Sequence, residues 1–168
     1  MSPGGQPLAD FATRLLAYMI DTAIVSAVFT VIFTPVALIV MFQRMSEIDM
    51  TTATESDFVS AMLGPLVLLE LGFFAVLLVA YYIYYVEVMH RSGQTIGKKA
   101  MKIRVVPLDP SARLTRGMAT KRYLMEFFVG LLVPFFSWLD GLWQLWDKPY
   151  LQTLHDKVAK TIVVKVGP

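Results

Sequence analysis

Two long runs of apolar residues constrain the fold of this chain more than any other feature. Residues 22–42 carry no charged side chain, and residues 62–86 carry one, Glu70. About 20 apolar residues in a helix cross the hydrocarbon core of a bilayer. The chain has 168 residues, of which 56% are hydrophobic and 17% charged, more apolar surface than a soluble domain of this size buries. We therefore expect an all-α integral membrane protein with two transmembrane helices, the first starting near Phe11.

A third apolar segment, residues 123–146, admits two interpretations. It is interrupted by Glu126, Pro134 and Asp140. As one helix it is long enough to span the bilayer, which would place the C-terminus outside. Alternatively, the break at Pro134 turns it into a re-entrant hairpin that returns to the side from which it came.

Two strand-like runs favour the hairpin. KIRVVPL (residues 102–108) and KTIVVKV (residues 160–166) are both rich in Val and Ile. A lone strand leaves its backbone polar groups unsatisfied, so the two runs are predicted to pair with each other. Pairing requires both to lie on the same side of the membrane. We expect a small two-stranded cytoplasmic element there.

The charges in the loops predict the orientation. Residues 87–122 hold nine Lys or Arg against two acids, whereas residues 43–60 hold one Arg against four acids. The positive-inside rule places the loop 87–122 in the cytoplasm, together with the N-terminus. Residues 1–8 are short and polar, and we expect them to be disordered ahead of a transmembrane domain over residues 9–166.

Several classes of function are excluded by composition. The absence of Cys removes disulfides, thiolate metal sites and Cys nucleophiles, and two His residues are too few for a transition-metal site. A net charge of +2 does not indicate nucleic-acid binding. GQTIGK lacks the spacing of a phosphate-binding loop. His155 beside Asp156 has no nucleophile in a matching context, so we predict a fold-supporting hydrogen bond for it. We predict no enzyme, no cofactor and no metal.

Four separated motifs occur in an order that resembles the RDD family of small, mostly bacterial membrane proteins. They are FATRLLAYMIDTAI, which contains Arg14 and Asp21; GQTIGKKAMKIRVV (residues 93–106); Arg122; and LHDKVAKTIVV (residues 154–164). The resemblance implies a multi-helix domain in the bacterial cytoplasmic (inner) membrane. It implies little about activity, although a cation/proton antiport role has been proposed for some members of the family. Two positions depart from the family pattern: Ile96 stands where Pro is common, and Lys160 where Gly is common.

Seven charged side chains within or beside the apolar segments are candidate site residues. A charge in the hydrocarbon core costs about 2.5–3.5 kcal/mol on insertion scales, so each needs a partner or a function. The seven are Arg14, Asp21, Glu70, Glu87, Glu126, Asp140 and Asp156. They form either an interfacial ion-pair network that locks the helices together or a path for protons or cations. The network is favoured for Arg14 and Asp21, and transport for Glu70.

Partners for the first two charges follow from their position at the inner end of the first helix. Arg14 is expected to meet Glu87 or Asp156. For Asp21 the candidates are Arg122, Lys121 or a capping backbone group.

A second candidate site lies on the basic loop. Thr95 is predicted to cap a short helix on the inner membrane surface. That helix would bring three lysines near lipid headgroups. They are Lys98, Lys99 and Lys102.

Three functional classes remain. The first, which we favour, is an accessory or assembly subunit of a larger membrane complex, held by apolar helix faces and the charge network. The alternative is a small cation/proton transporter that uses the intramembrane carboxylates. The third is a lipid-handling protein that works through the basic loop. The expected partners are membrane lipids and other membrane subunits or further copies of this chain.

Overall fold

The computed structural model describes residues 1–48, 51–52 and 54–167. The chain divides into two compact units. Unit 1 comprises residues 1–22 and 81–168, and unit 2 comprises residues 23–80.

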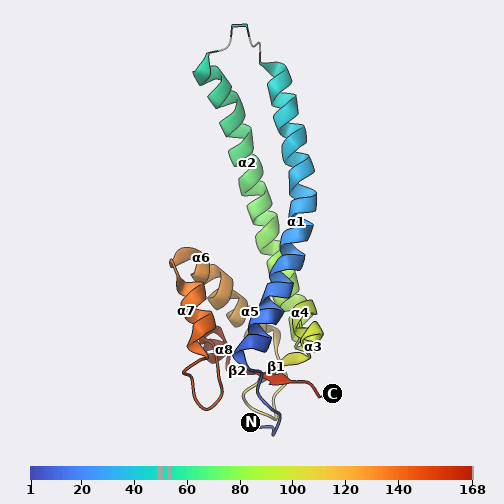
Figure 1. Ribbon diagram of the computed structural model, residues 1–168, viewed down its shortest axis with the longest axis vertical. Coiled ribbons are helices and arrows are strands. Elements are labelled where there is room, and N and C mark those ends of the chain that lie inside the picture. The colour runs from blue at the N-terminus through green and yellow to red at the C-terminus, as the bar shows by residue number, and fades with distance from the viewer. Residues whose placement is uncertain (49–50, 53, 168) are drawn as a thin grey trace. The chain divides into compact units, whose positions relative to one another are not determined.

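Unit 2 consists of two antiparallel helical segments (Figure 1). They belong to α1 (Phe11–Glu47) and α2 (Glu55–Tyr82). Aromatic rings join them: the Phe73 ring packs edge-on against Phe33 and Phe29, with centroids 4.6 and 5.8 Å apart. Such edge-to-face pairs are a favoured geometry for aromatic side chains.

Both predicted long helices are present. The helical stretches Phe11–Glu47 and Glu55–Ser92 are long and apolar enough to cross a membrane. Their most apolar windows are 0% and 6% buried within the chain. These side chains therefore have no protein interior of their own to pack in, as expected for helices whose solvent is lipid. The first helix starts at Phe11, as predicted, and runs without interruption through Pro35.

The two strand-like runs pair as predicted. Strands β1 (Ile103–Pro107) and β2 (Thr161–Lys165) form an antiparallel sheet in which Ile103 lies opposite Lys165. All of β2 except its last residue is buried, and Ile103, Val105 and Val163 of the two strands belong to the hydrophobic core of unit 1.

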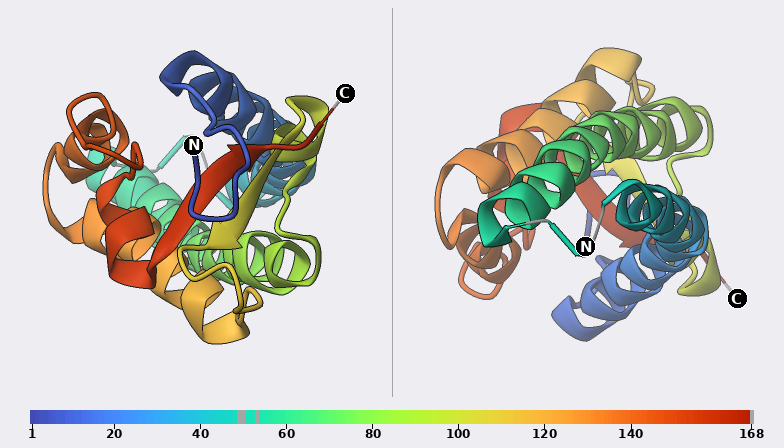
Figure 2. Two further views of the ribbon diagram at one scale, coloured as in Figure 1. Left: turned by 90° about the horizontal axis from the view of Figure 1, so that it is seen from below. Right: turned by 90° about the horizontal axis from the view of Figure 1, so that it is seen from above.

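The N-terminal segment, for which we predicted disorder, contacts β2 and also forms a hydrogen bond within itself. Leu8 forms an isolated antiparallel bridge with Val164 of β2. The Ser2 hydroxyl accepts a hydrogen bond from the Gln6 backbone N–H at 2.9 Å. Figure 2 shows the segment (blue) beside β2 (red) in its left view.

The rest of unit 1 is built from short helices. Two of them, η1 and η2, are π-helical turns, which are rare and tend to occur at functional sites. The helices are η1 (Ile83–Val88), α3 (Met89–Ser92), α4 (Ile96–Ala100), α5 (Arg116–Tyr123), η2 (Leu124–Val129), α6 (Gly130–Leu132), α7 (Phe136–Trp143) and α8 (Leu154–Ala159).

The third apolar segment adopts the hairpin conformation, visible at α6 and α7 in Figure 1. The helix ends at Val133, whose backbone is extended, and Phe135 then takes a left-handed conformation with φ 62°. Gly130 lets the two arms approach, because a Cβ there would lie 2.5 Å from the Ser137 hydroxyl. Among the described residues, only α1 and the helix from Glu55 pass the length and hydropathy test for a span.

Tyrosines from the end of the second long helix pack inside unit 1. The run YYIYY (residues 81–85) is, from the sequence alone, typical of an aromatic belt at a membrane interface, but Tyr85 is only 3% exposed. Its ring lies 4.7 Å from the Phe127 ring of η2, and Tyr82 packs edge-on against Tyr123 of α5. Part of the expected belt is therefore core, because the α5–η2 arm covers it.

Candidate functional site

A buried carboxylate, Asp156, joins the start of α1 to α5. It accepts hydrogen bonds from the guanidiniums of Arg14 and Arg122, one on each of its two oxygens. Arg14 also donates to the Leu151 carbonyl at 2.8 Å. Asp156 itself is held at the N-terminus of α8 by a capping box with Thr153. Of the two partners predicted for Arg14, the structure selects Asp156.

The environment of Asp156 keeps it ionised. Burial by itself would raise the pKa of this fully buried carboxyl group. The guanidiniums of Arg122 and Arg14 outweigh that effect and hold its pKa well below the usual range. Asp156 is therefore an anion between two cations at neutral pH, an arrangement that suits a structural lock better than a proton carrier.

Arg122 extends the cluster to His155 and Asp140. Its guanidinium lies 3.0 Å from His155 Nε2. Because a guanidinium only donates, Nε2 is the unprotonated acceptor and Nδ1 carries the hydrogen. Nδ1 then donates to Asp140 at 2.5 Å, and Asp140 also accepts the His155 backbone N–H at 2.8 Å. We call Arg14, Arg122, Asp140, His155 and Asp156 the charged core.

Asp21, two helical turns after Arg14, is held by a different set of groups. It is fully buried and accepts hydrogen bonds from Tyr84 (2.6 Å), Thr95 (2.5 Å) and the Gly97 backbone N–H (2.7 Å). The Lys98 ammonium lies 3.9 Å away. Of the partners we predicted for Asp21, only the capping backbone group is found, at the start of α4.

Gly97 is required for this contact. A Cβ there would lie 2.1 Å from the Ala17 carbonyl oxygen and 2.8 Å from the Asp21 carboxyl carbon. The backbone of α4 therefore lies directly against α1. Thr95, predicted to cap α4, accepts from the Lys98 N–H while its hydroxyl donates to Asp21.

A cavity of about 550 Å³ lies beside the charged core. Its apolar lining comes from the start of α1, from η2 and from α7, and includes Leu15, Phe127 and Trp138. The charged residues Arg14, Lys98, Arg122, Glu126 and Asp140 and the neutral His155 also line it. A concave, mainly apolar site of this size with a few polar groups is typical of small-molecule binding sites. We call it the apolar cavity.

Comparison with family models gives one match, to the RDD family, over residues 8–160. This chain belongs to the RDD family. No curated protein and no solved structure matches it. The RDD match and the two long apolar helices together indicate a membrane-type protein.

The chain departs from the RDD pattern at Lys160 and Ile96, and the backbone geometry at each position explains what the family residue would do there. Lys160 ends α8 in a left-handed conformation (φ 54°, ψ 49°), the conformation that glycine adopts at no steric cost. Ile96 is the first residue of α4, a position that suits proline. Here its N–H donates to the Tyr84 hydroxyl at 3.0 Å, a bond that proline cannot make.

The predicted site residues Glu87, Glu70, Lys99 and Lys102 lie outside the charged core and the apolar cavity. Glu87 pairs at 2.9 Å with Arg116, which is exposed, so this ion pair lies outside the charged core. Glu70 is exposed on α2 in unit 2, and within the described part of the chain it has no hydrogen bond or ion pair. Lys99 and Lys102 are exposed.

Glu126 and Lys98 are the predicted residues that face the apolar cavity without a close partner. The Glu126 carboxylate lies 3.9 Å from His155 Nδ1, which is already bound to Asp140. The Lys98 side chain is only 15% exposed and lies over the Tyr85 ring at 5.8 Å. Lys98 is thus separated from Lys99 and Lys102, with which we had grouped it.

Sequence reasoning missed several participants. Tyr84 lies in a tyrosine-rich run typical of an interfacial belt, and Thr95 was predicted only as a helix cap, although both hold Asp21. A capping signal does exist for Thr95, but nothing local indicates that its hydroxyl reaches a residue 74 positions earlier. Thr161, which accepts from Arg122 at 2.6 Å, lies at the start of a strand and carries no signal of its own.

Proposed function

We propose that this RDD protein binds a membrane amphiphile with a zwitterionic headgroup in the apolar cavity. The observation that carries the proposal is the state of the two opposite charges there. Neither Lys98 nor Glu126 has a charged partner closer than 3.9 Å among the described residues. An amphiphile whose head carries both a phosphate and an ammonium group would pair with both, while its chains contact the apolar wall.

The remaining charges of the lining are already engaged. Arg14 and Arg122 are bound to Asp156, and Asp140 is bound to His155. A purely anionic ligand would meet Glu126, and a purely cationic one would meet Lys98. Desolvation lowers the pKa of Lys98, and an incoming phosphate would favour its charged form. The charge pattern therefore favours a head with both signs.

The helical hairpin supports a location at the membrane interface. Phe135, Trp138 and Trp146 are 83%, 72% and 57% exposed, and Trp is enriched at the level of the lipid headgroups. The excess of basic residues in the loop 87–122 supports the cytoplasmic side of the bacterial inner membrane. In this arrangement the apolar cavity is reached from the inner leaflet, and the role is binding rather than catalysis.

The test is lipid retention by the full-length protein in mild detergent, measured by native mass spectrometry. We expect wild type to retain phosphatidylethanolamine over phosphatidylglycerol, and Glu126→Gln and Lys98→Gln each to lose that preference. Lys99→Gln, an exposed cation on the same helix as Lys98, serves as the control and should behave as wild type. Equal retention of both lipids, or a loss in the control as large as in the cavity variants, would refute the proposal.

The accessory and transport classes stay predictions. The exposed apolar faces of α1 and α2 fit a partner helix and lipid equally well, so they favour neither. Transport needs a carboxylate that changes its protonation state, and among the seven predicted site residues, all of which the structure describes, Glu70 in unit 2 and Glu126 in unit 1 have no close partner. Cation-driven proton flux in proteoliposomes that disappears in a folded Glu70→Gln variant would establish transport.

A further inference from the structure

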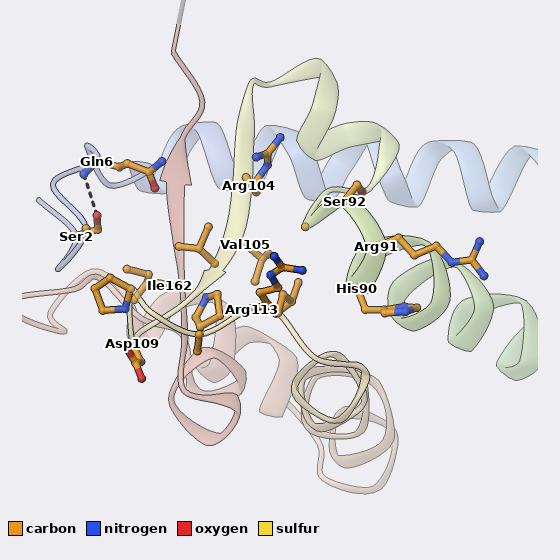
Figure 3. A pocket seen from close by; sticks show the side chains of 17 residues that line it. Ser2, Gln6, His90, Arg91, Ser92, Arg104, Val105, Asp109, Arg113 and Ile162 are labelled. Carbon is orange, nitrogen blue, oxygen red and sulfur yellow. Dashed lines mark hydrogen bonds between the residues drawn. The ribbon is translucent and has the colours of Figure 1, made fainter.

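A second concave site in unit 1 is lined by arginines instead of apolar side chains. The hollow has a volume of about 570 Å³ and shares no lining residue with the apolar cavity. Its walls come from the N-terminal segment, α3, β1 and the loop after β1 (Figure 3). Among its lining residues are Arg91, Arg104 and Arg113, and we call it the arginine groove.

The guanidiniums of these three arginines are not engaged elsewhere. In the part of the chain that the structure describes, none of them has a hydrogen bond or ion pair. In Figure 3 the Arg113 side chain lies between β1 and α3, Arg104 rises from β1, and Arg91 points away from the strands. Arg104 and Arg113 are therefore the principal cations of the groove, and Arg91 adds positive charge at its outer side.

The other polar groups of the groove are compatible with an anion. His90 Nδ1 lies 3.0 Å from the Val86 carbonyl. A carbonyl only accepts, so Nδ1 donates to it, and Nε2, an acceptor in the neutral ring, would donate to a phosphate only in the doubly protonated ring. Asp109 is the acid of the lining, and its carboxylate already accepts from the backbone N–H and hydroxyl of Ser111 at 2.9 and 2.7 Å. The arginines thus outnumber the acid.

The groove is preformed at the junction of α3 and β1. Gly93 ends α3 with φ 72°, and its carbonyl accepts the Val105 N–H at 2.8 Å. A Cβ at Gly93 would lie 2.6 Å from the Val105 carbonyl oxygen and 2.7 Å from Cγ of Arg104. The end of the helix and the stem of Arg104 are therefore in close contact, which fixes two walls of the groove relative to each other.

We propose that the arginine groove binds a diphosphate or longer phosphate group. Guanidiniums match phosphate oxygens in geometry and hold them by charge-assisted, often bidentate hydrogen bonds. Two principal arginines with a third at the outer side provide several bidentate donor pairs, and a volume of about 570 Å³ leaves room for an anion larger than a single phosphate. The same chemistry is offered by a soluble diphosphate and by a lipid headgroup with two phosphates.

The experiment measures binding to full-length protein with two probes. Inorganic pyrophosphate is titrated by calorimetry into protein in neutral detergent, and nanodiscs with and without a diphosphatidyl lipid test the headgroup. We expect saturable binding to at least one probe. Binding of pyrophosphate in detergent identifies a soluble ligand, whereas binding confined to the diphosphatidyl nanodiscs identifies a headgroup.

Variants connect the binding to the groove. Losing a charge-assisted hydrogen bond of this kind weakens binding about tenfold. We expect at least that loss for Arg104→Gln/Arg113→Gln and a smaller loss for Arg91→Gln. Lys99→Gln removes the same charge from an exposed site outside the groove and should leave affinity within about twofold of wild type, because the contact that it removes is not in the groove.

Melting temperature checks that the variants fold. The Arg104 stem contacts the backbone near Gly93, so Arg104→Gln could lower the melting temperature. In that case the binding affinity of Arg113→Gln alone is compared with that of wild type. Two results would overturn the proposal: no saturable binding to either probe, or a loss in Lys99→Gln equal to that of the double variant. Neither result bears on the apolar cavity, whose residues are unchanged in these variants.

Discussion

The two units of this chain differ in what surrounds their side chains. Helix α2 has no buried residue, and its surface is apolar. In unit 1 the fully buried side chains include Asp21 and Asp156, each surrounded by donors. Apolar side chains in lipid need no specific neighbour, whereas a buried charge needs particular partners at particular distances. The specific contacts of this protein therefore lie in unit 1. Four predictions test this difference between the units.

The largest effect is expected at Asp156. Asp156→Asn leaves the guanidiniums of Arg14 and Arg122 buried without their counter-charge, which costs about 3–5 kcal/mol of stability. Glu87→Gln breaks an ion pair with the exposed Arg116 and should cost about 0–1 kcal/mol. The free energy of unfolding in detergent is the measurement. Similar losses in the two variants would mean that the charged core is not the lock we describe.

Low pH should destabilise the folded protein through protonation of the Asp156 carboxylate. The folded pKa of Asp156 is depressed, so its contribution is complete above its unfolded pKa of about 4. That contribution is lost as the pH falls below this value and through the folded pKa, because the unfolded chain then binds the proton first. Unfolding measured from pH 7 to pH 2 should show the gap between wild type and Asp156→Asn narrowing only below about pH 4. A gap that narrows near neutrality would contradict this account.

Two helical glycines offer the most direct comparison between the units. Gly97→Ala forces a Cβ into the Ala17 carbonyl and Asp21, which should cost about 1–3 kcal/mol or more. Gly72→Ala in unit 2 meets nothing within 4 Å and should be neutral or stabilising by up to about 1 kcal/mol, because alanine is the better helix former. Thermal unfolding of both variants measures the contrast. A harmless Gly97→Ala would show that α4 is free to move from α1.

The smallest effect is expected at Lys160. Its left-handed backbone costs an L-residue about 1–2 kcal/mol, so Lys160→Gly should stabilise unit 1 by about 1 kcal/mol. Lys160→Ala removes the same charge but keeps the Cβ, and should bring no such gain. Denaturant unfolding of the two variants separates backbone strain from charge. An equal gain in both would assign the effect to the lysine charge.

Local patterns were sufficient for several features. The apolar runs predicted two helices, and the first begins at Phe11 as expected. The Val- and Ile-rich runs predicted the pairing of β1 with β2, because a lone strand leaves its backbone unsatisfied. That pairing in turn favoured the hairpin over a third span. The hairpin turn itself is made by the left-handed backbone of Phe135. No glycine marks that position in the sequence, so the local pattern could not predict it.

The two long helices, the paired strands and the Thr95 cap could all be predicted from local sequence patterns. Each depends on the periodicity, length or hydrogen bonding of a few neighbouring residues. Tertiary packing, in contrast, places Asp21 against Tyr84 and Gly97 instead of Arg122, and turns Lys98 towards a cavity instead of the surface. Those partners lie 63 and 76 positions from Asp21. Contacts at such separations arise from how the short helices pack, which no local pattern encodes.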